Sequence, residues 1–350
     1  MLKPANTIVR GRFAPSPTGF LHLGNAWAFL CAWLGARSVG GEIVMRFEDI
    51  DPQRAKLEFE HAIIEDLTWL GLNWDYGPGA PNIKAANTTG NVTDDSALLF
   101  APYRQSENIA DYASALAELE KRLLVYPCFC TRKELRSMAG APQAGDGADL
   151  EGAYPGICRT LSHKDIAQKT QSGLRYAMRL RFEEFRSAYL HIDDLCLGPV
   201  NLQEHEAGGD FALRRSDGVF AYQLAVVLDD IRMGVTQVVR GMDILLSTPR
   251  QLFLYELFGA TPPKYVHVPL MLDYEGERLA KRHAALSLRS LRAAGVTPEL
   301  VIGYLAWWGG LTTKFEPVAA HELLNNFSFK QIKTTVPQLP ADIEKVFISM

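Results

Sequence analysis

The sequence predicts an α/β fold in which an inserted module splits a parallel sheet. In the first quarter of the chain, strand-like and helix-like segments alternate, which is typical of strands joined by helical crossovers. Apolar strand-like runs return only after residue 221, so we expect them to complete the same sheet. The residues between these parts carry closely spaced cysteines and polar loops and resemble neither flank.

Composition narrows the class of protein. The chain has 350 residues, of which 47% are hydrophobic and 22% charged, enough for a buried core and about two domains. A net charge of -4 excludes a basic footprint over the whole molecule, so any contact with RNA has to come from local patches. No apolar run approaches the ~20 residues that span a bilayer, and the first residues lack the apolar core of a signal peptide. We expect a cytoplasmic monomer without a membrane partner.

The first quarter reads as strand, helix, strand, helix. Residues 7–13 and 41–49 have the pattern of strands, and a helix is predicted over 24–39 between them. Asp51 and Pro52 suit the N-cap and the first turn of a second helix. Its apolar stripe would contain Phe59, Ile63, Leu67 and Leu70.

The middle of the chain predicts a separate module. Residues 76–103 are rich in Gly, Pro, Asn and Thr and indicate a surface insertion. Helical spacing returns at Ile109, Tyr112, Leu116, Leu119 and Leu123. Residues 174–182 alternate arginines with apolar side chains, which predicts a strand with one packed face and one cationic face suited to phosphate.

The second half of the sheet is expected in three apolar runs, residues 222–230, 234–241 and 265–273, and a helical region follows. The predicted organisation is residues 1–108 for the first half of the catalytic domain, 109–210 for the inserted module, 211–275 for the second half, and 276–350 for a basic loop with a helical C-terminal part.

A Pro/Gly loop between the first strand and the first helix is a candidate nucleotide site. It extends from Arg12 to Asn25, and Gly19 and Gly24 would let phosphates approach the backbone at the helix N-terminus. The alternative is an ordinary connecting loop. It is not a P-loop, because no GK[ST] follows.

This loop, PSPTGFLHLGN, resembles the PSPTGxLHxGx signature of the glutamyl-type class I aminoacyl-tRNA synthetases. The resemblance implies a Rossmann-like catalytic domain in which His22 and Gly24 bind ATP, assisted by Mg²⁺ on the triphosphate. Asn25 stands where the family has a second histidine, and it cannot carry a charge. Residues 276–288 resemble the mobile KMSKS loop, which makes Lys281 the expected phosphate ligand, although Ala280 replaces the usual serine.

The resemblance also implies residues for binding glutamate. A side-chain carboxylate requires a cation, and an α-ammonium requires acceptors. By motif position these roles are expected for Arg12, Ser16, Glu48, Tyr222 and Arg240. The alternative for Glu48 and Arg240 is a surface ion pair.

Four residues form the pattern of a structural zinc site. Cys128, Cys130, Tyr154 and Cys158 follow the order C-x-C and Y-x3-C, and three thiolates with one phenolate can close a tetrahedron. Spacing alone leaves unrelated buried thiols as an equal alternative. The resemblance favours zinc, because glutamyl-queuosine tRNA(Asp) synthetases carry such a site. Cys31 and Cys196 are expected to serve only as core residues.

The chain stops where full glutamyl-tRNA synthetases continue into an anticodon-binding region, a plan similar to that of the glutamyl-queuosine tRNA(Asp) synthetases. The resemblance implies ATP, L-glutamate and tRNA(Asp) bearing queuosine as partners. Two alternatives stay open. One is a minimal glutamyl-tRNA synthetase that charges the tRNA 3' end, and the other is a catalytically silent relative that binds tRNA or ATP.

Overall fold

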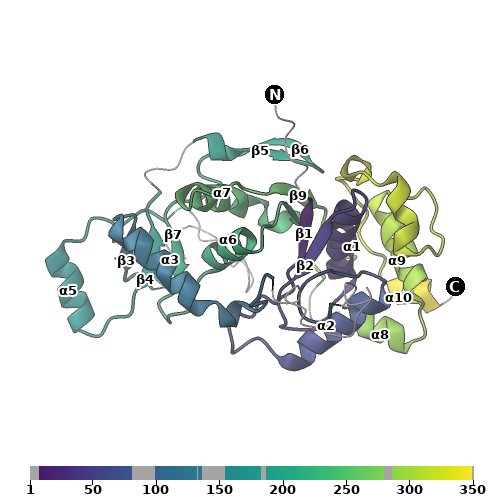
Figure 1. Ribbon diagram of the computed structural model, residues 1–350, viewed down its shortest axis with the longest axis horizontal. Coiled ribbons are helices and arrows are strands. Elements are labelled where there is room, and N and C mark those ends of the chain that lie inside the picture. The colour runs from purple at the N-terminus through teal and green to yellow at the C-terminus, as the bar shows by residue number, and fades with distance from the viewer. Residues whose placement is uncertain are drawn as a thin grey trace, which may run out of the picture.

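The computed structural model describes residues 8–80, 99–131, 133–135, 154–182, 187–279 and 286–348 (Figure 1). Most of the expected surface insertion at 76–103 lies outside these residues, and so does Lys281 with its neighbours Ala280 and Arg282. Within the described ranges, no helix is both long and apolar enough to cross a membrane.

A parallel sheet forms the centre of the fold, as predicted. Strand β1 (Arg10–Phe13) pairs in parallel with β2 (Glu42–Met45), and β8 (Gln237–Gly241) pairs in parallel with β9 (Lys264–Val268). The two pairs are joined where the Thr236 amide donates to the Arg10 carbonyl at 2.9 Å. Strands from both ends of the chain therefore point their carboxyl ends toward one edge of the sheet, where ligands of such sheets bind.

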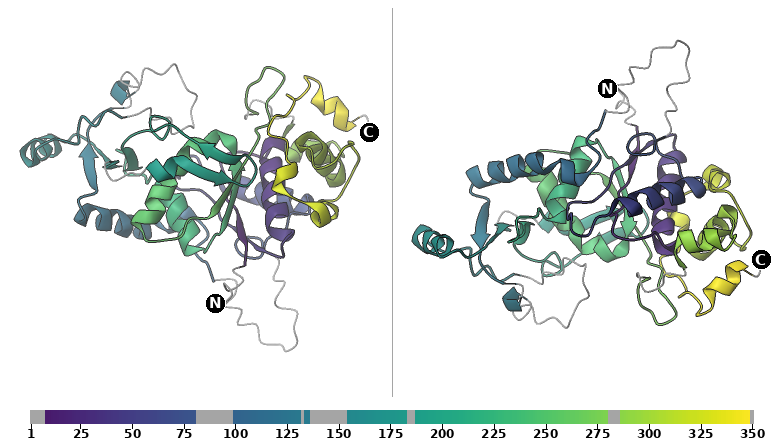
Figure 2. Two further views of the ribbon diagram at one scale, coloured as in Figure 1. Left: turned by 90° about the horizontal axis from the view of Figure 1, so that it is seen from above. Right: turned by 90° about the horizontal axis from the view of Figure 1, so that it is seen from below.

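Helix α1 (Leu23–Arg37) lies between this sheet and the C-terminal helices, as both views in Figure 2 show. It is buried on nearly all sides because α9 (Pro298–Gly309) covers the face turned away from the sheet. Trp27 meets Trp308 edge to face with ring centroids 5.6 Å apart. A Cβ on Gly309 would come within 2.0 Å of the Trp27 ring, so only glycine permits this approach.

The second helix starts later than predicted. Helix α2 (Leu57–Trp69) begins after Lys56, and the predicted N-cap at Asp51 is wrong. Asp51 instead accepts from the Gln53 amide at 3.3 Å and from Arg215 at 3.3 Å, so its carboxylate stabilises a turn that precedes the helix. The predicted apolar stripe is confirmed at Ile63, Leu67 and Leu70, which are buried.

An antiparallel sheet contains β3 (Val125–Cys128) and β4 (Ala177–Leu180) from the predicted inserted module, together with β7 (Phe211–Arg214), which was predicted in the second half of the catalytic domain. Helix α3 (Ile109–Lys121) confirms the predicted helical spacing at Tyr112, Leu116 and Leu119, which are buried, but Leu123 lies beyond its end and is exposed. The predicted cationic face of β4 is wrong at Arg179, which is 1% exposed and donates to the Asp210 carbonyl at 3.0 Å. An apolar–cationic alternation does not show whether a neighbouring loop covers the cationic side.

The run 222–230 is the helix α6 (Tyr222–Arg232) and not a strand. Residues on nearly all of its faces are buried among α3, α7 (Thr248–Leu257) and β7, so the sequence lacks the polar face by which a helical period is recognised. A short apolar run with two adjacent valines has no periodicity that distinguishes a helix from a strand. The other two predicted runs are confirmed as β8 and β9.

The remaining described elements complete the chain order. They are η3 (Gln105–Glu107), α5 (His163–Gln171), η4 (Ser187–Leu190), β5 (His191–Asp194), β6 (Gly198–Asn201), η5 (Met242–Ser247), α7 (Thr248–Leu257), α8 (Leu288–Ala293), η7 (Ala320–Asn326), η8 (Phe329–Gln331) and α10 (Ile343–Ile348). Strands β5 and β6 pair antiparallel, and the Leu195 amide donates to the Tyr265 carbonyl at 3.1 Å, which places this hairpin beside β9.

Candidate active site

His22 is the N-cap of α1 at the ligand-binding edge of the sheet. Its Nδ1 accepts from the Asn25 amide at 3.4 Å, and its own amide donates to Asn25 Oδ1 at 3.1 Å. An imidazole that accepts at Nδ1 carries its proton on Nε2 when neutral, so Nε2 is a donor. A Cβ on Gly24 would lie 3.2 Å from the His22 ring, so glycine at this position lets the imidazole fold over the first turn. The structure thus brings His22, Gly24 and Asn25 together.

The described residues that follow the segment of Lys281 lie beside the His22 loop. The backbone of His22 forms an antiparallel bridge with Ser287, and the Leu288 amide donates to the Leu21 carbonyl at 2.8 Å. Leu279 and Leu286, which flank the undescribed residues, belong to the same hydrophobic core as Leu21. Ser287 and Leu288 therefore fix the chain after this segment next to His22.

Four of the five residues expected to bind glutamate lie close enough together for their charges to interact. Burial raises the pKa of Tyr222, the charge of Glu48 raises it further, and the charges of Arg240 and Arg12 oppose this. Glu48 is itself a buried carboxyl whose pKa burial raises, while the nearby cations Arg46 and Arg12 oppose that rise. Arg12 and Arg240 are 6% and 5% exposed, which excludes a surface ion pair for Arg240. A cluster of two cations, one carboxylate and one phenol can bind a zwitterion.

Ser16 is exposed in the turn that precedes the signature helix, and the Thr18 amide donates to its carbonyl at 2.8 Å. The carbonyl of its neighbour Pro15 accepts from the Glu48 amide at 2.9 Å. This backbone contact places the Ser16 turn directly next to Glu48.

Arg240 is held by three neighbouring side chains. Its Nη1 donates to Gln251 at 2.7 Å, its Nη2 to Thr248 at 2.8 Å and its Nε to His267 Nε2 at 3.0 Å. Because His267 accepts at Nε2, its proton is on Nδ1, which donates to Asp194 at 2.7 Å. Burial, with the charge of Arg240, lowers the pKa of His267, so the imidazole stays neutral and continues to accept.

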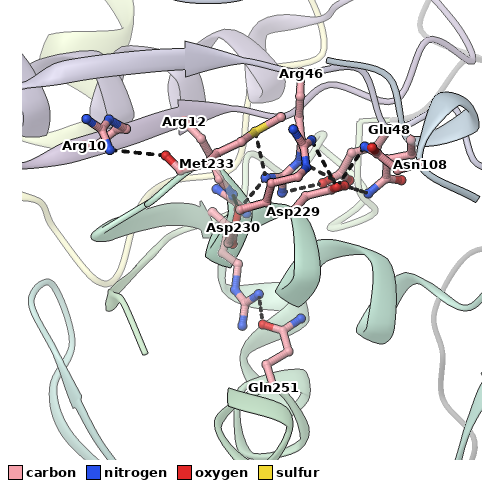
Figure 3. A network of polar contacts seen from close by, with 12 residues as sticks. Arg10, Arg12, Arg46, Glu48, Asn108, Asp229, Asp230, Met233 and Gln251 are labelled. Atoms are coloured by element: carbon pink, nitrogen blue, oxygen red, sulfur yellow. Dashed lines mark hydrogen bonds and ion pairs between the residues drawn. The ribbon is translucent and has the colours of Figure 1, made fainter. Parts of the chain in front are cut away.

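A buried ionic network connects Arg12 and Glu48, two of the other residues expected to bind glutamate (Figure 3). Arg46 is fully buried and lies 2.5 Å from Asp230 and 3.2 Å from Glu48, and Asp230 lies 3.3 Å from Arg12. The adjacent Asp229 accepts from Gln105, Asn108 and Tyr112 at 3.0, 3.1 and 2.9 Å. One guanidinium therefore fixes both Glu48 and the carboxylate that orients Arg12.

Sequence reasoning did not identify these supporting residues. Arg46 stands two positions before Glu48, and the Asp229–Asp230 pair ends the run that was predicted as a strand. Two adjacent acidic residues at the end of an apolar run were the available signal, because buried carboxylates require cationic partners. His267 and Asp194 had no such signal, since their pairing depends on the β5–β9 contact.

Three of the four predicted metal ligands are cysteines whose sulfurs all lie within 4.8 Å of one another. The Sγ atoms of Cys130 and Cys158 are 3.6 Å apart, and the Tyr154 hydroxyl lies 3.4 Å from Cys128 Sγ and 3.6 Å from Cys130 Sγ. A zinc tetrahedron with Zn–S of about 2.3 Å and Zn–O of about 2.0 Å has S–S edges of about 3.8 Å and S–O edges of about 3.5 Å. The cluster fits a metal of this size, and it belongs to the part of the chain predicted as the inserted module.

The Tyr154 oxygen has surroundings that suit a ligand atom. The Cys158 amide donates to it at 2.9 Å, and the buried Arg179 guanidinium lies 4.3 Å from the ring centroid. Both groups favour negative charge on the phenol. Cys31 is buried in the core and Cys196 lies on the β5–β6 hairpin, so neither belongs to this cluster.

Comparisons with known proteins agree on one family. Residues 8–339 match the family model described as tRNA synthetases class I (E and Q), catalytic domain. The chain is 52% identical, over 96% of its length and 97% of the relative's, to the glutamyl-Q tRNA(Asp) synthetase of Nitratidesulfovibrio vulgaris. It is 43% identical, over 95% of its length and 96% of the relative's, to the protein of the same name from Symbiobacterium thermophilum. Among solved structures, the glutamate-tRNA synthetase of Elizabethkingia anophelis superposes with a TM-score of 0.75 at 26% identity, and the match covers 97% of this chain and 70% of that one.

Proposed function

Because the chain belongs to the class I tRNA synthetases (E and Q), and is therefore an aminoacyl-tRNA ligase, we propose that it activates L-glutamate with ATP and transfers it to queuosine in the anticodon loop of tRNA(Asp). The choice of glutamate as the substrate is supported by the cluster of Arg12, Glu48, Tyr222 and Arg240, in which both arginines are buried. The proposal of queuosine as the acceptor is supported by the 52% identity to a glutamyl-Q tRNA(Asp) synthetase over almost its whole length.

In the proposed binding mode, Arg240 and Arg12 bind the side-chain carboxylate of glutamate, while Glu48 and the Tyr222 hydroxyl orient the α-ammonium. Ser16 binds the α-carboxylate from the turn beside Glu48. An acidic substrate is selected because a buried guanidinium is stabilised more by a carboxylate than by an uncharged side chain, and the partners given above for Arg240 are all uncharged.

The proposed reaction has two steps. A carboxylate oxygen of glutamate attacks the α-phosphorus of ATP and pyrophosphate leaves, and then a queuosine hydroxyl attacks the carbonyl carbon of the adenylate and AMP leaves. His22 Nε2, the amides of the first turn of α1 and Lys281 stabilise the negative charge on the phosphates. Mg²⁺ bound to the triphosphate would supply further positive charge there.

We also propose that Cys128, Cys130, Tyr154 and Cys158 bind one structural Zn²⁺ in an inserted module at residues 109–210. The observed sulfur–sulfur and sulfur–oxygen separations support this proposal. A site with four protein ligands has no open coordination position, so the ion would stabilise the module and take no part in the reaction.

The substrate assignment is tested by amino-acid-dependent exchange of pyrophosphate into ATP. We expect exchange with L-glutamate and none with L-aspartate, and equal exchange with both would refute the choice of glutamate. The acceptor is tested by charging tRNA(Asp) with labelled glutamate, digesting it and identifying the labelled nucleoside.

Label on the terminal adenosine would favour the alternative of a minimal glutamyl-tRNA synthetase. Complete absence of exchange in zinc-replete protein would favour the silent relative. Retention of His22 and Gly24 in helix-capping geometry argues against that last alternative.

A further inference from the structure

Aromatic rings and cations meet on an exposed surface next to the signature loop. Phe20, which is 37% exposed, packs edge to face on Phe59 with ring centroids 5.1 Å apart. The Arg289 guanidinium lies 4.9 Å from the Phe20 centroid, and the Lys56 ammonium lies 5.6 Å from the Phe59 centroid. We call these four residues the Phe20 surface.

The Phe20 surface is fixed rigidly to the candidate ATP site. Phe20 stands two residues before His22, and Arg289 stands two residues after Ser287, the bridge partner of His22. The Lys56 amide donates to the Pro17 carbonyl at 3.0 Å, which ties the start of α2 to the same loop. A ligand on the Phe20 surface would therefore lie beside a substrate held at His22.

Neither the fold nor the proposed chemistry of activation requires this arrangement. Phe20 and Phe59 are absent from the buried cores of the protein, and Arg289 and Lys56 are exposed. The neighbouring Leu57 is 60% exposed, which adds apolar area to the same surface. Phe20 is exposed and Phe59 half-buried, and accessible aromatic rings between cations are typical of surfaces that stack single-stranded bases, because a base adds π-stacking and its phosphate adds charge attraction.

We propose that the Phe20 surface binds an unpaired nucleotide of the tRNA, adjacent to the nucleotide that receives glutamate. This inference rests on the proposed function and adds the place where the acceptor strand is held. Charge complementarity identifies the occupant: the protein has a net charge of -4, but this surface combines two cations with two aromatic rings. Nearby Glu58, which lies 3.6 Å from Lys56, leaves Arg289 as the stronger phosphate ligand.

The test compares activation of glutamate with its transfer. Arg289→Gln and Phe59→Leu should leave glutamate-dependent pyrophosphate exchange unchanged and raise the KM for tRNA about tenfold, because stacking and phosphate contacts are made only with the acceptor. Phe20→Leu should impair transfer in the same way, and Phe20→Tyr should restore it because it retains an aromatic face. Lys314→Gln, at an exposed cation of the C-terminal region, is the matched control and should leave both steps unchanged.

Salt dependence and competition provide independent readouts. The slope of log KM for tRNA against log salt should decrease in Arg289→Gln and not in Lys314→Gln. A short single-stranded RNA should inhibit transfer by the wild type more strongly than transfer by Arg289→Gln. Unchanged KM for tRNA in all the variants, with exchange intact, would overturn the inference but not the proposed function. Absence of exchange in the wild type would instead overturn the proposed function. A lower Tm without any change in the KM for tRNA would show that these residues are only structural.

Discussion

His22 and Ser287 pair through their backbones although strands β2 to β9 separate them in sequence. The bridge places the C-terminal end of the Lys281 segment against the N-terminus of α1. Lys281 lies outside the described residues, so its contact with the phosphates of ATP stays a prediction.

Lys281→Ala should lower the rate of glutamate-dependent pyrophosphate exchange about a hundredfold or more, because it removes a cation that stabilises the transition state. The KM for glutamate should change little, since Lys281 is proposed to contact only phosphate. Lys314→Gln serves as the control for loss of an exposed cation. An exchange rate in Lys281→Ala equal to that of the wild type would exclude the proposed role.

Arg46→Gln should raise the KM for glutamate about tenfold and make it depend on pH. Arg46 is the largest of the charges that oppose the raised pKa of Glu48. Without Arg46 the pKa of Glu48 rises further, so the carboxyl stays protonated at the acidic end of the pH range. A protonated carboxyl no longer attracts the ammonium group of glutamate. The KM should therefore fall as the pH rises from about 6 to about 8.5. Steady-state exchange kinetics over this range provide the measurement.

Arg10→Gln is the matched control, because Arg10 lies on the same sheet and forms its ion pair with Glu42 at 3.0 Å, outside the network around Glu48. Both variants lose an arginine, but only Arg46→Gln should change the pH profile. Identical profiles would show that Arg46 supports the fold without acting on Glu48. Arg46→Gln should also be destabilised by about 3 kcal/mol or more, since it leaves buried carboxylates without their cation.

His267→Phe should raise the KM for glutamate, because it removes the acceptor that orients Arg240 Nε. His267→Gln retains a side-chain oxygen that can accept and should recover most of the affinity. We expect a difference of about tenfold between the two variants, as for loss of one hydrogen bond to a charged group. Equal KM values would show that Gln251 and Thr248 are sufficient to hold the guanidinium.

Cys158→Ala should lower the zinc content of the purified protein from about one equivalent to well below that, as measured by elemental analysis. Tm should fall by about 1–2 °C for each kcal/mol of binding energy lost in a chain of this length. Cys196→Ala should retain the metal, because Cys196 lies outside the cluster. Full zinc content in Cys158→Ala would exclude the proposed ligand set.

The buried carboxyl of Asp66 should make the free energy of unfolding depend on pH. It is fully buried in α2, neither oxygen has a hydrogen-bond partner, and burial raises its pKa to about 6. Between the unfolded pKa of about 4 and this value the folded state binds the extra proton, so the free energy of unfolding should fall as the pH rises from about 4 to about 6. The decrease should be about 3 kcal/mol, since the pKa differs by about two units between the two states.

Asp66→Asn should remove this part of the pH dependence. Urea titrations at several pH values measure the effect, and Asp111→Asn is the control, since Asp111 is an exposed carboxylate in α3. An unchanged slope in Asp66→Asn would show that another group is responsible.

The sequence predicted the elements that have a clear apolar pattern or that lie between Gly/Pro segments. The strands β1, β2, β8 and β9 and the helices α1 and α3 were predicted in this way. Prediction was wrong for α6 because the short run 222–230 is buried on nearly all sides and shows no helical period, whereas the equally buried α1 is longer and follows the Pro/Gly loop. It was wrong for Arg179 because a strand pattern does not reveal what covers each face.

Prediction of the site had a similar limit. Residues that would touch substrate, such as Arg240 and Glu48, were identified from motifs, and the structure brings them together, although their contact with glutamate stays a prediction. The residues that hold them, Arg46, His267 and Asp194, depend on contacts between segments far apart in sequence. Spacing within one motif carries no information about such contacts.

The hydrogen bonds from His267 to Asp194 and from Arg240 to His267 extend from the hairpin β5–β6 to the proposed carboxylate ligand. If docking of the hairpin on β9 improves the affinity for glutamate, bound glutamate must stabilise the docked hairpin by the same free energy. This follows because the coupling between two binding equilibria is reciprocal. Protection of the Asp194 and Leu195 amides from hydrogen exchange should then increase when the amino acid is added.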